Sequence, residues 1–123
     1  MTTSEKVGTG IVYVTQDVMV RGADGAMQRK FNTEPAQQYG SVRTLLAGNT
    51  RMFSSVHVVR MLKEQLRSFS ENDYLLLLGD PSVMAAASAI ASARNGGRFK
   101  ILVWDRMMFG YVPVQIDISG KAL

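Results

Sequence analysis

Three aspartates stand where apolar runs that we predict to be strands come to an end: Asp17, Asp80 and Asp105. Ligands of open α/β sheets bind at the carboxyl ends of parallel strands, so these side chains are the candidates for chemistry. If their strands are neighbours, the carboxylates could share a Mg²⁺ ion and support phosphoryl or phosphodiester chemistry. The competing interpretation is structural, because Asp80 precedes Pro81 as a helix cap does and Asp105 precedes Arg106 as a turn or ion-pair residue does. The metal site, and Mg²⁺ as a cofactor, are therefore kept as an alternative reading only.

Motifs of other catalytic classes are absent from the sequence. His57 is the only histidine and there is no cysteine, so no zinc-ligand set exists, and no serine lies in a nucleophile-elbow context. The pattern G-x-x-x-x-G-K-[ST] is missing, and no G-x-G-x-x-G follows a predicted strand. We predict no catalytic residues and interpret His57 as a surface or boundary residue of a helix.

Basic side chains are concentrated in one part of the chain. Residues 20–67 carry eight Lys or Arg residues against three acidic ones, whereas the remainder is close to neutral. Such a segment can attract nucleic acid or an acidic partner, although a solvated basic face that favours solubility has the same pattern. The residues predicted to bind nucleic acid are Arg21, Arg29, Lys30, Arg60, Lys63 and Arg67.

Aromatic and apolar residues near the C-terminus offer a second kind of contact. Trp104, Phe99 and Tyr111 could stack bases beside Lys100 and Arg106, although strand aromatics more often belong to the core. The predicted hairpin tip is unusual, because tips are normally polar and this one is Met107, Met108 and Phe109. We predict that these three residues contact a partner, with local packing against Trp104 or Tyr111 as the alternative.

The residues from 73 to 106 form the unit that must position these side chains. An apolar run at 75–78 does not alternate with polar residues, so both faces of that strand should be covered. Asp80 and Pro81 start an alanine-rich helix that Asn95, Gly96 and Gly97 end. A second apolar run follows, which predicts two parallel neighbouring strands joined by a helix with a right-handed crossover.

The remaining pattern completes a single small α/β domain of order ββαβαββ, with a mostly parallel central sheet and an antiparallel C-terminal edge hairpin. Pro113 lies in the last strand and predicts an edge position, because proline cannot donate to a ladder. The predicted helix before residue 70 has an apolar stripe of Val56, Val59, Leu62, Leu66 and Phe69. The other expected segments are a flexible leader at 1–9, the domain at 10–118, strands at 10–20 and 42–47, a mobile basic loop at 21–30, a helical turn at 34–40 and a tail at 119–123.

Composition limits the broad class of the protein. The 123 residues suffice for one domain with its own core, and the lack of cysteine fits a reducing compartment. Neither a signal peptide nor an apolar run of about 20 residues is present. We therefore expect a soluble, cytoplasmic protein with no membrane partner.

Several stretches resemble small uncharacterised proteins encoded by tailed bacteriophages. They are D-Y-L-L-L-L-G-D-P at 73–81, R-N-G-G-R-F at 94–99, L-V-W-D-R at 102–106, Y-V-P-V-Q-I-D at 111–117 and A-Q-Q-Y-G at 36–40. The resemblance spans most of the chain from Ile11. It implies a phage-encoded protein in the host bacterial cytoplasm and transfers no catalytic residue.

These observations favour a non-enzymatic phage-type accessory protein that binds a macromolecular partner. Nucleic acid is slightly preferred over a host or phage protein because of the basic segment. One alternative is a metal-dependent phosphodiester or phosphoryl enzyme that uses the strand-end aspartates. Another is a virion assembly component, in which the apolar tip would be an assembly contact, and a homo-oligomer is a possible state of either protein.

Overall fold

The computed structural model describes residues 10–48, 50 and 55–120. The predicted leader at 1–9 and the last three residues of the predicted tail lie outside these residues. The elements in chain order are β1 (Gly10–Gln16), β2 (Met19–Arg21), β3 (Met27–Arg29), the 3-10 helix η1 (Glu34–Tyr39), β4 (Gly40–Leu46), α1 (Ser55–Gln65), β5 (Tyr74–Leu76), α2 (Pro81–Arg94), β6 (Arg98–Asp105) and β7 (Gly110–Asp117).

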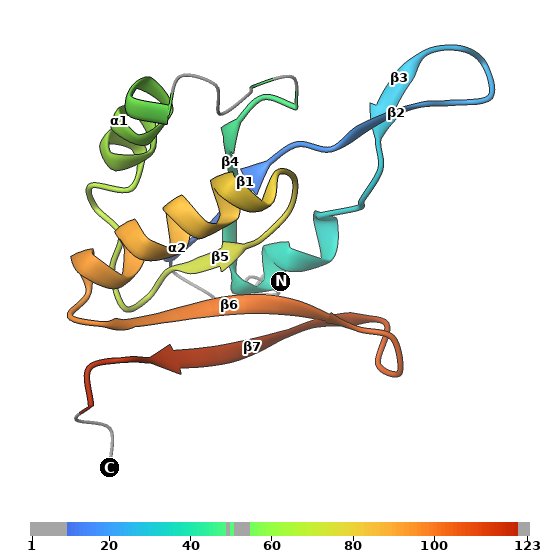
Figure 1. The fold of residues 1–123 in the computed structure, drawn as a ribbon. Helices are drawn as coiled ribbons and strands as arrows, with labels where there is room; N and C mark the ends of the chain where they lie inside the picture. Colours follow the sequence, from blue (N-terminus) through green and yellow to red (C-terminus); the bar gives the residue numbers. More distant parts are fainter. Residues whose placement is uncertain (1–9, 49, 51–54, 121–123) are drawn as a thin grey trace.

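A five-stranded sheet of order β4-β1-β5-β6-β7 forms the centre of the molecule (Figure 1). The first four of these strands are parallel, and β7 runs antiparallel to β6 at one edge. Tyr74 and Leu75 of β5 pair with Lys100 and Ile101 of β6, which confirms the predicted parallel neighbours. The predicted fold class is therefore confirmed, and Pro113 lies in an edge strand as predicted.

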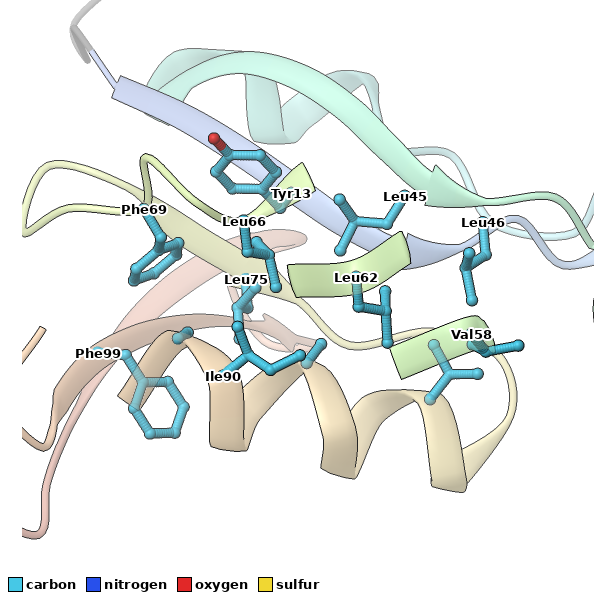
Figure 2. Close-up of a cluster of buried hydrophobic side chains, with 13 residues drawn as sticks. Tyr13, Leu45, Leu46, Val58, Leu62, Leu66, Phe69, Leu75, Ile90 and Phe99 are labelled. Carbon is cyan, nitrogen blue, oxygen red and sulfur yellow. The ribbon is translucent and has the colours of Figure 1, made fainter. Parts of the chain in front are cut away.

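Two helices, α1 and α2, pack on one face of the sheet (Figure 1). Alternate strand residues such as Tyr13, Leu75 and Phe99 point toward them, because successive side chains of a strand face opposite ways. Figure 2 shows these side chains meeting those of the helices in one core cluster. The helix residues of the cluster are Val58, Leu62, Val83, Ala87, Ile90 and Ala91, and Leu66 joins them directly after the end of α1.

The buried stripe of α1 differs from the predicted one at its start. Val56 is 71% exposed, whereas Val58 is buried together with Leu62 and Leu66. Both valines lie near the beginning of the helix, and a spacing of four residues from Val58 to Leu62 and Leu66 keeps the contacts on one face. The prediction that Val56 begins the stripe is therefore wrong, while Leu62, Leu66 and Phe69 are buried as expected.

The ends of α2 follow the predicted chemistry. The Asp80 carboxylate accepts a hydrogen bond from the Ser82 N–H at 2.8 Å, and Pro81 occupies the first turn. At the other end the Gly97 N–H donates to the Ser92 carbonyl at 2.8 Å. Gly97 has a φ of 90°, a left-handed conformation that an L side chain would strain.

The opposite face of the sheet carries η1, which covers part of it. Ala36 of η1 is buried against Val12 and Val14 of β1, in a second cluster that also contains Leu76, Leu102 and Tyr111. A 3-10 helix of six residues is short, so it leaves this face open toward β6 and β7. The two faces of the sheet are therefore covered to different extents.

Residues 19–30 form a hairpin where a mobile basic loop was expected. The strands β2 and β3 pair in antiparallel register, separately from the main sheet. The Asp24 carboxylate accepts from the Ala26 N–H at 3.0 Å, and Gly25 has a φ of 86°, as is typical of an Asp-Gly pair in a hairpin turn. We call this hairpin the basic arm. Within the described part of the chain, no helix is long and apolar enough to cross a membrane.

Candidate functional site

The carboxyl end of β1 is the topological switch point of the sheet. The chain leaves β1 through η1 to reach β4 on one side, and arrives at β5 on the other side through α1. Ligand sites of doubly wound folds lie at such a point. A crevice of about 240 Å³ is present there. Its lining residues are Gln16, Asp17, Val18, Met19, Gly48, Thr50, Gly79 and Asp80.

The buried side chain of Gln16 bridges the two sides of this crevice. Its amide nitrogen donates to the carbonyls of Ala47 and Thr50, both at 3.0 Å, and its oxygen accepts from the Asp80 N–H at 2.9 Å. A Cβ at Gly79 would lie 2.5 Å from the Gln16 amide oxygen, so glycine is required there. The crevice is thus held by structural hydrogen bonds that involve every polar atom of the Gln16 side chain.

The three candidate aspartates each make a local contact. Asp17 forms an ion pair with Arg29 at 3.2 Å. Asp80 caps α2, and one oxygen of Asp105 accepts from the N–H groups of Met107 and Met108 at 2.8 and 3.3 Å. Asp17 and Asp80 line the same crevice, but Asp105 does not.

Among the described residues, no three His, Cys, Asp or Glu side chains come together in a group that could hold a metal ion. The predicted three-aspartate arrangement is therefore not assembled. His57 is exposed on α1, as expected for a surface residue.

A larger, apolar groove lies on the sheet face that η1 only partly covers. Its volume is about 570 Å³. The sheet supplies residues from the end of β5, from β6 and from β7, and the segment after β3 supplies the other side. The lining residues are Lys30, Phe31, Asn32, Leu76, Leu77, Leu78, Ile101, Leu102, Val103, Trp104 and Tyr111. We call it the aromatic groove.

Aromatic side chains are held in fixed positions around this groove. Trp104 is 45% exposed and meets the buried ring of Tyr111 edge-on, with 5.1 Å between the ring centroids. The Tyr111 hydroxyl donates to the Asn32 carbonyl at 3.3 Å, and the Tyr39 hydroxyl donates to the Tyr111 carbonyl at 2.7 Å. These bonds tie β7 to η1 and to the segment that precedes it. Burial also raises the pKa of the Tyr111 phenol above its usual value.

The charge around the groove is positive. Lys30 is the only charged residue in its lining, and its ammonium lies 5.4 Å from the centroid of the Phe31 ring. On β6, Lys100 lies 4.4 Å from the ring centroid of Tyr74, a residue of the same core cluster as Tyr111. The groove therefore combines apolar walls with one cationic group, Lys30, and has no carboxylate in its lining.

The six predicted basic residues fall into two separate sets. Arg21, Arg29 and Lys30 lie on or next to the basic arm, and Arg60, Lys63 and Arg67 lie on or just after α1. Figure 1 shows the arm and α1 on opposite sides of the molecule. Only the first set adjoins the aromatic groove, because Lys30 lines it.

Local contacts already hold several of these basic side chains. Arg21 donates to the Gly25 carbonyl at 2.7 Å within the arm, and Arg29 pairs with Asp17. Arg67 forms an ion pair with Glu64. The Lys30 N–H donates to the Val18 carbonyl at 2.8 Å, which fixes the base of the arm and leaves the Lys30 ammonium beside Phe31.

The predicted contact residues at the β6–β7 tip are held in solvent. Met107, Met108 and Phe109 are 88%, 69% and 79% exposed. Asp105 caps the turn, and Phe109 has a φ of 52°, a conformation that is rare for a residue other than glycine. We call these three residues the apolar tip. Its exposure shows that the tip does not pack against Trp104 or Tyr111.

The sequence pointed to only part of the groove. Trp104 and Tyr111 were named as possible stacking residues and do lie together, because they are directly paired across β6 and β7. Phe99 was grouped with them but is buried on the helix-covered face. Phe31 was missed, since its position beside the sheet depends on the path of the chain between β3 and η1.

The fold and groove define a small single-domain α/β protein with an incompletely covered sheet face. Residues 10–118 match the family model described as Phage Pam3 gp32-like protein, and the chain belongs to this phage-encoded family. This confirms the resemblance to small phage proteins. No curated protein and no solved structure matches the chain.

Proposed function

We propose that this phage protein is a non-enzymatic accessory protein that binds nucleic acid through the basic arm and the aromatic groove. The observation that carries the proposal is the position of Lys30, which ends the arm and lines the same groove as Phe31 and Trp104, with its ammonium beside the Phe31 ring. Cations that follow a phosphate backbone next to exposed aromatic rings are the common arrangement of sites that bind single strands.

Electrostatics supports the same assignment. The chain has a net charge of +4, and residues 19–30 contain Arg21, Arg29 and Lys30 against Asp24 alone. Each phosphate that such a cation contacts releases counterions, so binding must weaken as salt is raised. The ion pair of Arg29 with Asp17 reduces the free charge of the arm, which makes Arg21 and Lys30 the cations to test.

The test compares two matched double variants. Arg21→Ala with Lys30→Ala removes two cations from the arm, and Arg60→Ala with Lys63→Ala removes two from α1. Anisotropy of a labelled oligonucleotide, single-stranded and as a duplex, is measured between about 50 and 200 mM salt. We expect the arm variant to weaken binding and to lower the slope of log K against log salt by about 1 to 2.

The outcomes separate clearly. Lack of binding of either oligonucleotide at low salt rejects the proposal. A larger loss for the α1 variant moves the interface to the helix and also rejects the arm as the site. Both variants have the same net charge, so a general effect of charge would weaken oligonucleotide binding equally in the two variants.

A second candidate function rests on the apolar tip. Three large apolar side chains that are more than two-thirds exposed on a capped turn suit a host or phage protein as the partner, and a virion assembly contact is one form of it. Met108→Asp should abolish a complex or an oligomer in size-exclusion chromatography with light scattering, without lowering the free energy of unfolding. Asp105→Asn tests the turn, because it weakens the cap and leaves the three apolar side chains in place.

A further inference from the structure

Resting on the proposed function, we infer that the ligand is an unpaired strand, one of whose bases enters the aromatic groove and stacks on Trp104 or Phe31. The ligand class is thus single-stranded DNA or RNA rather than a duplex.

The lining suits the faces of a nucleobase. Ten of the eleven lining residues are uncharged, and Phe31 and Trp104 are both at least 40% exposed. A base in a duplex is stacked on its neighbours above and below, so its face is not available to a protein ring. An unpaired base has a free face, and stacking on an aromatic side chain is tolerant of sequence.

The single charge of the lining is placed for a phosphate. The Lys30 ammonium lies 5.4 Å from the centroid of the Phe31 ring, so a cation stands at the same end of the groove as one of the rings. No carboxylate lines the groove, so nothing there repels a polyanion. A ligand that carries both a flat apolar ring and a nearby negative charge matches this pairing, and a nucleotide is such a ligand.

The groove is also prearranged. Tyr111 supports Trp104 edge-on, and its hydroxyl donates to the Asn32 carbonyl next to Phe31. The two sides of the groove are thus connected through one side chain. A site whose rings are already placed needs little ordering on binding.

Trp104 is the only tryptophan of the chain and reports on the groove directly. Oligo(dT), oligo(rU) and a mixed-sequence duplex are titrated against the full chain at one low salt concentration while its fluorescence is followed. We expect the single strands to quench Trp104 and the duplex to leave its fluorescence unchanged. The two single-strand arms show whether DNA or RNA is preferred.

Variants then test the stacking itself. Trp104→Ala should weaken single-strand binding about 5- to 100-fold, measured by anisotropy of a labelled oligo(dT). Trp104→Phe should recover most of the affinity, because it restores a ring. Phe31→Ala keeps the fluorescent reporter and tests the other side of the groove. Val114→Ala, on the opposite face of the β6–β7 hairpin, is the matched control and should change nothing.

The results distinguish this inference from the function on which it rests. If a duplex and a single strand bind equally and Trp104→Ala binds as well as the parent chain, the unpaired base is rejected while nucleic-acid binding stands. If no oligonucleotide binds, both fail. Circular dichroism of each variant shows whether it is folded, and if Trp104→Ala is not, Phe31→Ala decides.

Discussion

The two faces of the central sheet are built from alternating residues of the same strands, yet they differ in what covers them. On one face, Leu75 of β5 is fully buried in the cluster that includes α1 and α2. On the other face, Leu76 packs in the smaller cluster with η1, and Leu78 lines the aromatic groove. The same leucine run therefore contributes to the core on one face of the sheet and to a candidate binding site on the other face.

This difference follows from the lengths of the covering elements. The helices α1 and α2 have 11 and 14 residues, whereas η1 has six and is a 3-10 helix. At about 1.5 Å per residue an α-helix of 14 residues spans about 21 Å, which is comparable to a strand of six residues. A short 3-10 helix cannot cover the same area, so apolar residues near the ends of β5 and β6 stay accessible. The open face is therefore the one available for a partner.

The largest expected effect is a difference in the free energy of unfolding between substitutions at Leu75 and Leu78, two leucines of the same apolar run. Leu75→Ala should lower the free energy of unfolding by about 2 to 5 kcal/mol, because the side chain is fully buried between strands and helices. Leu78→Ala should cost about 1 kcal/mol, because Leu78 is only partly buried. Urea denaturation measures both values. Equal losses would contradict the difference between the two faces.

The next effect concerns the Gln16 side chain, which bridges the crevice at the carboxyl end of β1. Gln16→Leu should cost about 1 to 3 kcal/mol, because it leaves the Ala47 and Thr50 carbonyls and the Asp80 N–H without their partner. Gln16→Glu is the closer control, since it keeps an acceptor for the Asp80 N–H and loses the two donors. Thermal unfolding of the parent chain and of the two variants ranks their stabilities. A Gln16→Leu variant as stable as the parent would show that this bridge is dispensable.

Much of the architecture could be predicted from local patterns. The unbroken leucine run, the Asp80-Pro81 helix start and Pro113 in an edge strand all report on the environment of their own segment. Each of them depends on backbone chemistry that does not change with distant contacts. The prediction of a parallel β5–α2–β6 unit was therefore correct, and the family match agrees with the resemblance carried by the same stretches.

The site was harder to predict because it depends on long-range placement. Phe31 joins Trp104 only because the segment between β3 and η1 passes over the ends of β5 and β6. The aspartates stand at strand ends as expected, and the structural interpretation of Asp80 as a helix cap and of Asp105 as a turn residue matches their hydrogen bonds. The ion pair of Asp17 with Arg29 of the arm is a long-range contact that no local pattern reveals. The β2–β3 hairpin was predicted as a mobile loop, although the Asp24-Gly25 pair at its turn is typical of a hairpin.

A smaller effect on stability tests which residues of α1 face the sheet. Val58→Ala should lower the free energy of unfolding by about 1 to 2 kcal/mol, because Val58 is buried in the core cluster. Val56→Ala should change it by less than about 0.5 kcal/mol, since its side chain is largely in solvent. The two substitutions lie two residues apart on α1 and remove the same atoms. The reverse order in urea denaturation would restore the stripe predicted from the sequence.

The smallest effect compares a tyrosine from each face and appears only at high pH. Burial raises the pKa of Tyr13 and of Tyr111, and for Tyr13 the Asp73 carboxylate adds to the rise while Arg43 opposes it. The folded chain keeps these phenolic protons at a pH where the unfolded chain loses them. Their contribution to stability is therefore complete below about pH 10 and declines as the pH rises above it.

Arg43 separates the two tyrosines experimentally. Its guanidinium lies 5.9 Å from the centroid of the Tyr13 ring, so Arg43→Ala should raise the pKa of Tyr13 further and leave that of Tyr111 unchanged. Nuclear magnetic resonance of ring-labelled tyrosine follows all four tyrosines in one sample, and Tyr13→Phe and Tyr111→Phe assign the two signals in question. If Arg43→Ala moved both titrations together, the two faces would be electrostatically coupled through the sheet. The helix-covered face could then no longer be treated as independent of the face that carries the groove.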